Sequence, residues 1–178
     1  HLARRRTRRR RVAALGGAAI ALTGAAAAAL ALRGVPPRPD PCPDPVGRLA
    51  DTWGPTTRAA IVGAFGRTGA PFAIDTIDRV VPLLDRYAED WRRATRASCR
   101  ATHVEHRQSP ALLDLRTACL DRRLRDLGVL TAVFVAADRD VVKSAIEFVG
   151  KLPAIADCAD DQQLLQAQPL PTEPRLRA

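Results

Sequence analysis

Residues 109–134 have the sequence SPALLDLRTACLDRRLRDLGVLTAVF, which is the longest regular pattern in the chain. Leu113, Leu120, Leu127 and Phe134 recur every seven residues, as expected for one face of a helix. The stretch opens with a serine followed by a proline, which suits a helix N-cap and a first helical position that needs no N–H. The pattern therefore predicts one long amphipathic helix.

The sequence before this stretch predicts two more helices. A short amphipathic segment covers residues 58–65 and is followed by a turn rich in glycine and proline. A longer helix is expected to end near Cys99, and Pro82 predicts a kink inside it or a helix start close before the proline. Its apolar stripe has spacings of three and four residues: Ile77, Val80, Leu84, Ala88 and Trp91.

Two further helices are expected after the stretch. Asp138 or Asp140 caps the first, and Pro153 opens the second. The first is expected to bury Val141, Ala145, Val149 and Leu152. No segment alternates convincingly with the period of a strand. The predicted fold class is therefore all-α, with a bundle of four to five mostly antiparallel helices over residues 46–167, because the turns are short.

The first 33 residues differ from the rest in charge and hydropathy. Residues 1–11 contain seven arginines, and residues 12–32 contain no charge. A helix of that length spans about 30 Å, the thickness of a bilayer's hydrocarbon core. Residues 12–32 are therefore predicted to form a transmembrane helix. Residues 1–11 are expected to be a basic cytoplasmic juxtamembrane segment and residues 33–178 to be extracytoplasmic, because basic flanks stay in the cytoplasm.

A cleaved signal peptide is the alternative interpretation of the apolar run, because Ala29-Leu30-Ala31 has the small-x-small form of a cleavage site. Both interpretations export the rest of the chain. Residues 33–45 contain six prolines and are expected to form an extended spacer, and residues 168–178 a Pro-rich tail or linker. The chain lacks methionine and begins with His1, so we expect it to be a fragment of a longer polypeptide.

The net charge of +9 does not indicate a nucleic-acid-binding protein. Eight arginines and no acidic residue lie at or before Arg33, and the remainder carries 20 basic and 19 acidic residues. Arginines beside a transmembrane helix interact with anionic lipid headgroups. The bilayer is therefore an expected partner, and nucleic acid is not.

Four cysteines follow the apolar run: Cys42, Cys99, Cys119 and Cys158. An even number of cysteines in an exported domain predicts two disulfides. The sequence alone does not select among the three pairings. An antiparallel helical hairpin favours a bridge between Cys99 and Cys119, which leaves Cys42 to join Cys158 across the two ends of the domain.

A zinc site is the alternative use of these cysteines. Cys99, His103, His106 and Cys119 would supply two sulfurs and two imidazoles within a short stretch. Their spacing is not that of a zinc finger, in which tight turns supply pairs of ligands. We therefore predict no metal site.

No motif in the chain indicates catalysis. No serine lies in a nucleophile motif, no Gly-rich phosphate loop follows a strand, and the signatures of protein kinases are absent from the chain. Most acidic residues have an arginine three or four positions away, as on a solvated helix face. Examples are Asp75 with Arg79, Glu89 with Arg93 and Asp121 with Arg125. We therefore predict no catalytic or cofactor-binding residue, and that this chain is not itself an enzyme.

Residues 111–124, ALLDLRTACLDRRL, closely resemble a segment of bacterial membrane-anchored serine/threonine protein kinases. In that family a cytoplasmic kinase domain precedes one transmembrane helix, a cysteine-containing helical region and, often, tetratricopeptide repeats. Residues 1–166 resemble this arrangement, although Pro82 stands where the family favours a helix-forming residue. The other landmarks occur in the same order: Cys42, Trp53, TGAPFA at 68–73, YAEDW at 87–91, ASCRAT at 97–102, Gln108-Ser109, Leu152-Pro153 and DCAD at 157–160.

The resemblance implies that the chain is the transmembrane and extracytoplasmic sensor or interaction region of a receptor-like serine/threonine kinase in the bacterial inner membrane. The kinase domain itself is missing from the chain, so no catalytic residue can be assigned by resemblance. Gly16, Gly17 and Gly24 offer small surfaces for a homodimer through the transmembrane helix, which would couple an unknown extracytoplasmic ligand to the kinase. The alternative is an exported or membrane-anchored, disulfide-bonded helical protein with a structural or adaptor role and no kinase.

Overall fold

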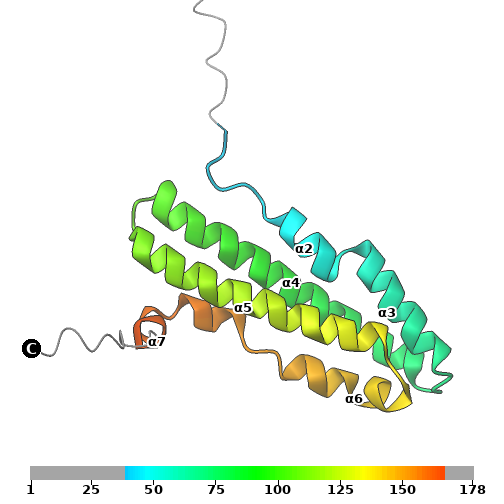
Figure 1. The fold of residues 1–178 in the computed structure, drawn as a ribbon. Coiled ribbons are helices and arrows are strands. Elements are labelled where there is room, and N and C mark those ends of the chain that lie inside the picture. Colours follow the sequence, from blue (N-terminus) through cyan, green and yellow to red (C-terminus); the bar gives the residue numbers. More distant parts are fainter. Residues whose placement is uncertain (1–38, 167–178) are drawn as a thin grey trace, which may run out of the picture. The chain divides into compact units, whose positions relative to one another are not determined.

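The computed structural model describes residues 39–166, and all regular structure in this range is helical (Figure 1). This confirms the prediction of an all-α fold. In chain order the elements are α2 (Val46–Trp53), α3 (Pro55–Arg67), α4 (Ala73–His103), α5 (Pro110–Val135), α6 (Arg139–Gly150), the 3₁₀ helix η1 (Ile155–Ala159) and α7 (Asp161–Gln166).

The two long helices, α4 and α5, form an antiparallel hairpin at the centre of the bundle. Helices α2 and α3 lie along one edge of the hairpin, and α6, η1 and α7 lie along the other (Figure 1). Both α4 and α5 contact elements on both edges. Every other described element therefore packs against this hairpin.

Side-chain caps fix the start of α5 and of α6. The Ser109 hydroxyl accepts a hydrogen bond from the Leu112 amide at 3.2 Å, which confirms the predicted start of the longest amphipathic stretch. The Asp138 carboxylate accepts one from the Val141 amide at 2.8 Å, so Asp138 rather than Asp140 caps α6. Inside α6, Val142 is buried in place of the expected Val141, which is half-buried.

Helix α4 is longer than the sequence suggested. It begins at Ala73, well before Pro82, and continues past Cys99 to His103 without interruption. Pro82 lies on the exposed face of the helix, and so does Asp78 one turn earlier. The carbonyl that loses its helical donor at the proline therefore faces solvent, where water can replace the missing hydrogen bond.

The predicted last helix opening at Pro153 is wrong. The chain instead forms the short 3₁₀ helix η1, followed by the separate helix α7. Ile155 and Cys158 are both buried, with 7% and 3% of their surface exposed. A 3₁₀ helix places residues three apart on the same face, so burying this pair favours that geometry over an α-helix.

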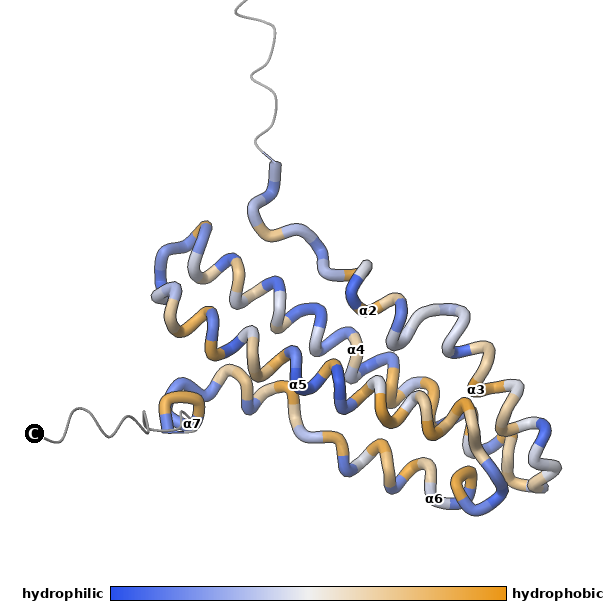
Figure 2. The backbone as a smooth tube through the Cα atoms, in the orientation of Figure 1, coloured by the Kyte–Doolittle hydropathy of each residue, from blue (hydrophilic) through white to orange (hydrophobic). Residues whose placement is uncertain are grey.

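The bundle has two apolar clusters, and most residues of the predicted stripes belong to them. The first cluster lies between α3, α4, α5 and α6 and includes Phe65 and Phe134, whose rings meet edge to face at 5.4 Å. Figure 2 shows hydrophobic residues concentrated in α3 and in the second half of α5, at this end of the bundle. The second cluster lies towards the turn between α4 and α5, and its buried members are Trp91, Cys119, Leu120, Ile155, Cys158 and Leu164.

Within residues 39–166, none of the helices has both the length and the apolar character that are needed to cross a bilayer. The predicted transmembrane helix at residues 12–32 lies outside the described part of the chain. The predicted juxtamembrane segment at residues 1–11 and the tail at residues 168–178 also lie outside it.

Candidate functional site

Two disulfides fasten the ends of the described chain to the central hairpin. Cys42 is bonded to Cys99 on α4 with a Cα–Cα distance of 5.7 Å, and Cys158 of η1 is bonded to Cys119 on α5 with a Cα–Cα distance of 5.6 Å. The prediction of two disulfides is confirmed. The favoured pairing, Cys99 with Cys119 and Cys42 with Cys158, is wrong.

The helix boundaries explain why the hairpin is not bridged. Cys99 lies about one turn before the end of α4, whereas Cys119 lies about two and a half turns into α5. The two cysteines are therefore not level in the hairpin, and a disulfide requires Cα atoms within about 7 Å. Each cysteine instead meets a chain end that packs across its own helix.

The disulfides also remove the ligands of the alternative zinc site. Both of its sulfurs are bonded to other sulfurs, and a zinc ligand must be a free thiolate. His103 ends α4, and His106 lies in the following turn with a backbone φ of 51°. Between residues 39 and 166, no group of three His, Cys, Asp or Glu side chains is placed to hold a metal ion.

Residues 40–44, here called the strap, are held on α4 by more than the disulfide. Asp40 forms an ion pair of 2.9 Å with Arg96, and Asp44 forms another with Arg92. The hydrogen bond from the Cys42 amide, followed by that from Arg96, lowers the pKa of Asp40 below its usual range. The expected spacer is thus attached to α4 from Asp40 onwards, because alternate strap residues meet one face of the helix.

The conspicuous arginines of residues 111–124 fasten the other chain end. Arg116 donates hydrogen bonds to Asp161 at 2.6 Å and to the Gln108 side-chain carbonyl at 2.7 Å. Arg123 donates to the Ala154 carbonyl oxygen at 3.3 Å. Together with Cys119 these side chains form one stripe of α5 that holds η1 and α7. The stretch that carries the family resemblance therefore has a structural role in this fold.

The predicted local ion pairs are only partly present. Glu89 lies 3.7 Å from Arg93, as the sequence predicted. Asp121 pairs instead with Arg48 of α2 at 2.6 Å, and no ion pair joins Asp75 to Arg79 in the described range. Exposed ion pairs within one helix contribute little to stability, so an acidic side chain can pair with an arginine of another helix instead.

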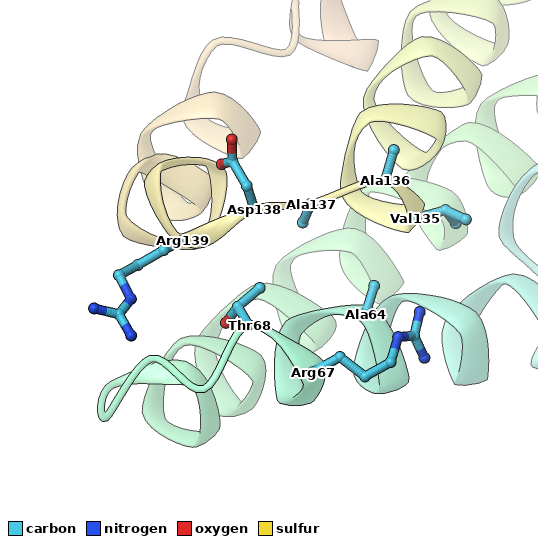
Figure 3. A pocket seen from close by; sticks show the side chains of 8 residues that line it. All are labelled: Ala64, Arg67, Thr68, Val135, Ala136, Ala137, Asp138 and Arg139. Carbon is cyan, nitrogen blue, oxygen red and sulfur yellow. The ribbon is translucent and has the colours of Figure 1, made fainter.

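A hollow of about 440 Å³ lies at the opposite end of the bundle from both disulfides, where α3 ends and α5 turns into α6 (Figure 3). We call this end, formed by the turns at residues 68–72 and 136–138, the free end. The hollow is lined by Ala64, Arg67, Thr68, Val135, Ala136, Ala137, Asp138 and Arg139.

The charged groups of this hollow are Arg67, Arg139 and Asp138. No ion pair in the described part of the chain involves Arg67 or Arg139. Figure 3 shows their guanidinium groups on opposite sides of the hollow, pointing away from each other, and the Asp138 carboxylate directed away from Arg139. Sequence analysis missed both arginines, although neither has an acidic residue three or four positions away, a pattern that could have indicated them.

Two other hollows are lined by polar groups that already have partners. Beside Trp53, the indole N–H donates to Asp85 at 2.8 Å, and Arg58 pairs with the same carboxylate while stacking on the indole ring. On the outer face of α4, each arginine lining the hollow has at least one carboxylate within ion-pair distance: Arg92, Arg93, Arg96 and Arg100.

Comparisons with protein-family models, with curated proteins and with solved structures find no match to this chain.

Proposed function

We propose that this chain is the transmembrane and extracytoplasmic sensor or interaction region of a bacterial receptor-like serine/threonine protein kinase. The observation that carries the proposal is the pair of disulfides, because structural disulfides persist in oxidising compartments outside the cytoplasm. The basic segment and apolar run at residues 1–32 supply the expected anchor, and residues 111–124 supply the family resemblance.

The strap gives the outer domain a short connection to this anchor. Only residues 33–39 separate the expected transmembrane helix from Asp40, and seven residues span at most about 25 Å. Because Asp40, Cys42 and Asp44 are fastened to α4, a displacement of α4 also displaces the start of this connection. A ligand that binds better when two such chains are paired would then shift the population of paired kinases.

The topology can be tested with reporter fusions to the chain in bacteria. Alkaline phosphatase fused after residue 166 is expected to be active, because it folds only outside the cytoplasm. The matched control is a chain in which the arginines of residues 1–11 are replaced by glutamine, which should weaken the orientation signal and lower that activity. An inactive fusion of the unaltered chain would contradict the proposed localisation.

The kinase is tested by the coding sequence upstream of His1. An in-frame Gly-rich loop, catalytic-loop Asp and metal-binding Asp-Phe-Gly are expected there, and the complete protein should phosphorylate itself on serine or threonine. A start codon immediately before His1 would overturn the proposal. It would favour an exported or anchored helical protein with a structural or adaptor role, which the structural use of Arg116 and Arg123 also suits.

A further inference from the structure

We propose that the outer domain binds a second copy of this chain, anchored in the same membrane, through an exposed apolar face in the second half of α5. The inference names a partner for the sensor function proposed above and rests on that function for the membrane anchor. We call this surface the valine face, and it consists of Val129, Ala132, Val133 and Ala136.

The valine face is apolar although it is exposed to solvent. The segment 128–136 contains no charged residue. Its one polar side chain, Thr131, is buried and donates to the Gly128 carbonyl oxygen at 3.0 Å. Val129 is 68% exposed and Val133 is 41% exposed. Spacings of three and four residues place the members of the face on one side of the helix, and a helix that is apolar on every side is typical of one that other surfaces cover.

Opposite charges lie at the two ends of the valine face. Arg125 lies seven positions before Ala132, and Asp138 lies six positions after it. Both charged residues are exposed, and neither takes part in an ion pair in the described part of the chain. Figure 3 shows the Asp138 carboxylate directed to the same side as the Ala136 side chain, and Arg139 directed to the other side. The acidic group therefore borders the valine face, and the neighbouring arginine does not.

This order of groups is complementary to itself when it is reversed. A twofold axis perpendicular to α5 near Ala132 places two copies of the helix antiparallel to each other. Val129 of one copy then lies beside Val133 of the other, and Arg125 of each copy lies beside Asp138 of the other. The Asp138 carboxylate also caps α6, but a carboxylate has about four acceptor sites and can accept from an arginine as well.

The size of the valine face indicates a copy held in the same membrane rather than a soluble partner. A stable interface uses about 20–30 residues from each side, and this face with its two flanking charges falls far short of that. Two chains that residues 12–32 anchor in one bilayer meet at an effective concentration of up to about millimolar, at which a weak contact forms. The anchor therefore supplies what the small area lacks.

The test uses the full chain in bacterial membranes, with an added cysteine as the probe. All four native cysteines are bonded, so a new cysteine is the only free thiol. Ala132→Cys places two thiols next to the twofold axis, and a mild oxidant is expected to join them into a covalent dimer on a non-reducing gel. The control is Ile74→Cys, at 73% exposure on α4 and outside the valine face. It should form dimer at least about tenfold more slowly, because a disulfide needs Cα atoms within about 7 Å.

Further substitutions in the Ala132→Cys chain test the reversed arrangement. Arg125→Gln and Asp138→Asn each remove one member of the ion pair, while asparagine keeps the cap of α6. Each should slow dimer formation about two- to tenfold, and the double variant should be no slower than either alone, because both changes remove the same pair. Val129→Asp should abolish the dimer, because it places a carboxylate in an apolar contact. Arg139→Gln, whose side chain is directed to the other side in Figure 3, should leave the rate unchanged.

Each negative outcome identifies which statement is wrong. Equal rates for Ala132→Cys and Ile74→Cys, or no dimer although the chain is in the membrane fraction, would overturn this contact and leave the tests of topology and phosphorylation unaffected. Linkage of Ala132→Cys to a different protein would also overturn it, because another molecule would then cover the face. Absence of the chain from the membrane fraction would contradict the anchor of the proposed function and, with it, the pairing.

Discussion

Replacing Cys42 and Cys99 together by alanine is expected to loosen the strap, which keeps only its ion pairs with α4, while both apolar clusters stay packed. Neither cysteine belongs to either apolar cluster, although Cys42 itself is buried, at 1% exposure. The bond closes a loop of 57 residues, for which the chain-entropy model gives about 4 kcal/mol of stabilisation. The stability of a small domain is about 5–15 kcal/mol, so the variant should remain folded but unfold at clearly lower denaturant concentration.

The matched comparison is the double replacement of Cys119 and Cys158 by alanine. This bond closes a loop of 39 residues, so the same model again gives about 4 kcal/mol. Both of these cysteines lie in the cluster around Trp91. The two variants should therefore lose similar stability but differ in which part of the protein loosens.

Guanidinium unfolding followed by tryptophan fluorescence measures the loss of stability. Amide hydrogen exchange shows which part of the protein loosens. In the first variant, faster exchange should be limited to the strap and the start of α2. In the second it should extend through η1 and α7, because they lose their covalent attachment to α5. Peptide mapping without reduction should show the two bonds that the structure contains.

Two outcomes would refute this reasoning. One is loss of protection throughout the bundle on replacing Cys42 and Cys99, which would mean that the strap is part of the folding core. The other is a disulfide between Cys99 and Cys119 in the peptide map, which would show that the pairing favoured by the sequence is the correct one.

Three further predictions follow from single positions. Gly54→Ala should destabilise the domain by about 1–3 kcal/mol in urea unfolding, because its Cβ would lie 2.3 Å from a carbonyl oxygen one turn earlier. The control is Gly66→Ala, which has open space around it and should be neutral or stabilising. Asp40→Asn should lower the melting temperature at neutral pH. The variant and the unaltered protein should converge as pH falls from the ordinary value of 3.8 through the lowered pKa of Asp40, since protonation removes the same ion pair. Leu127→Ala, at 0% exposure, should lower the free energy of unfolding by about 2–5 kcal/mol in chemical denaturation. Val129→Ala, at 68% exposure, should lower it little. Equal losses of stability in the two variants would contradict the burial of Leu127 in the core.

The helices of the central hairpin could be predicted from the sequence because their determinants are local. Leu120, Leu127 and Phe134 are buried as their spacing predicted, and the hydroxyl of Ser109 caps the helix it precedes. An apolar stripe and a helix cap depend on residues within a few turns of each other, so both can be recognised in the sequence. The local patterns were weaker at the chain ends, where η1 replaced an expected helix.

The free end could not be predicted in the same way. Arg67 and Arg139 are 72 positions apart in the sequence, and no local pattern relates them. They line one hollow only because α3 and the turn into α6 pack beside each other at the end of the hairpin. The Asp121–Arg48 pair is a similar case, since its partner comes from another helix rather than from the next turn.

The sequence by itself determined the helical class, the presence of two disulfides and the face that each long helix buries. These follow from composition and from spacing along one chain segment. Only the tertiary structure decided which cysteines meet, that the expected spacer is docked from Asp40, and where two arginines lie without carboxylate partners. The physical reason is that such contacts depend on how far two helices are offset along their axes, and a shift of a few residues changes every partner.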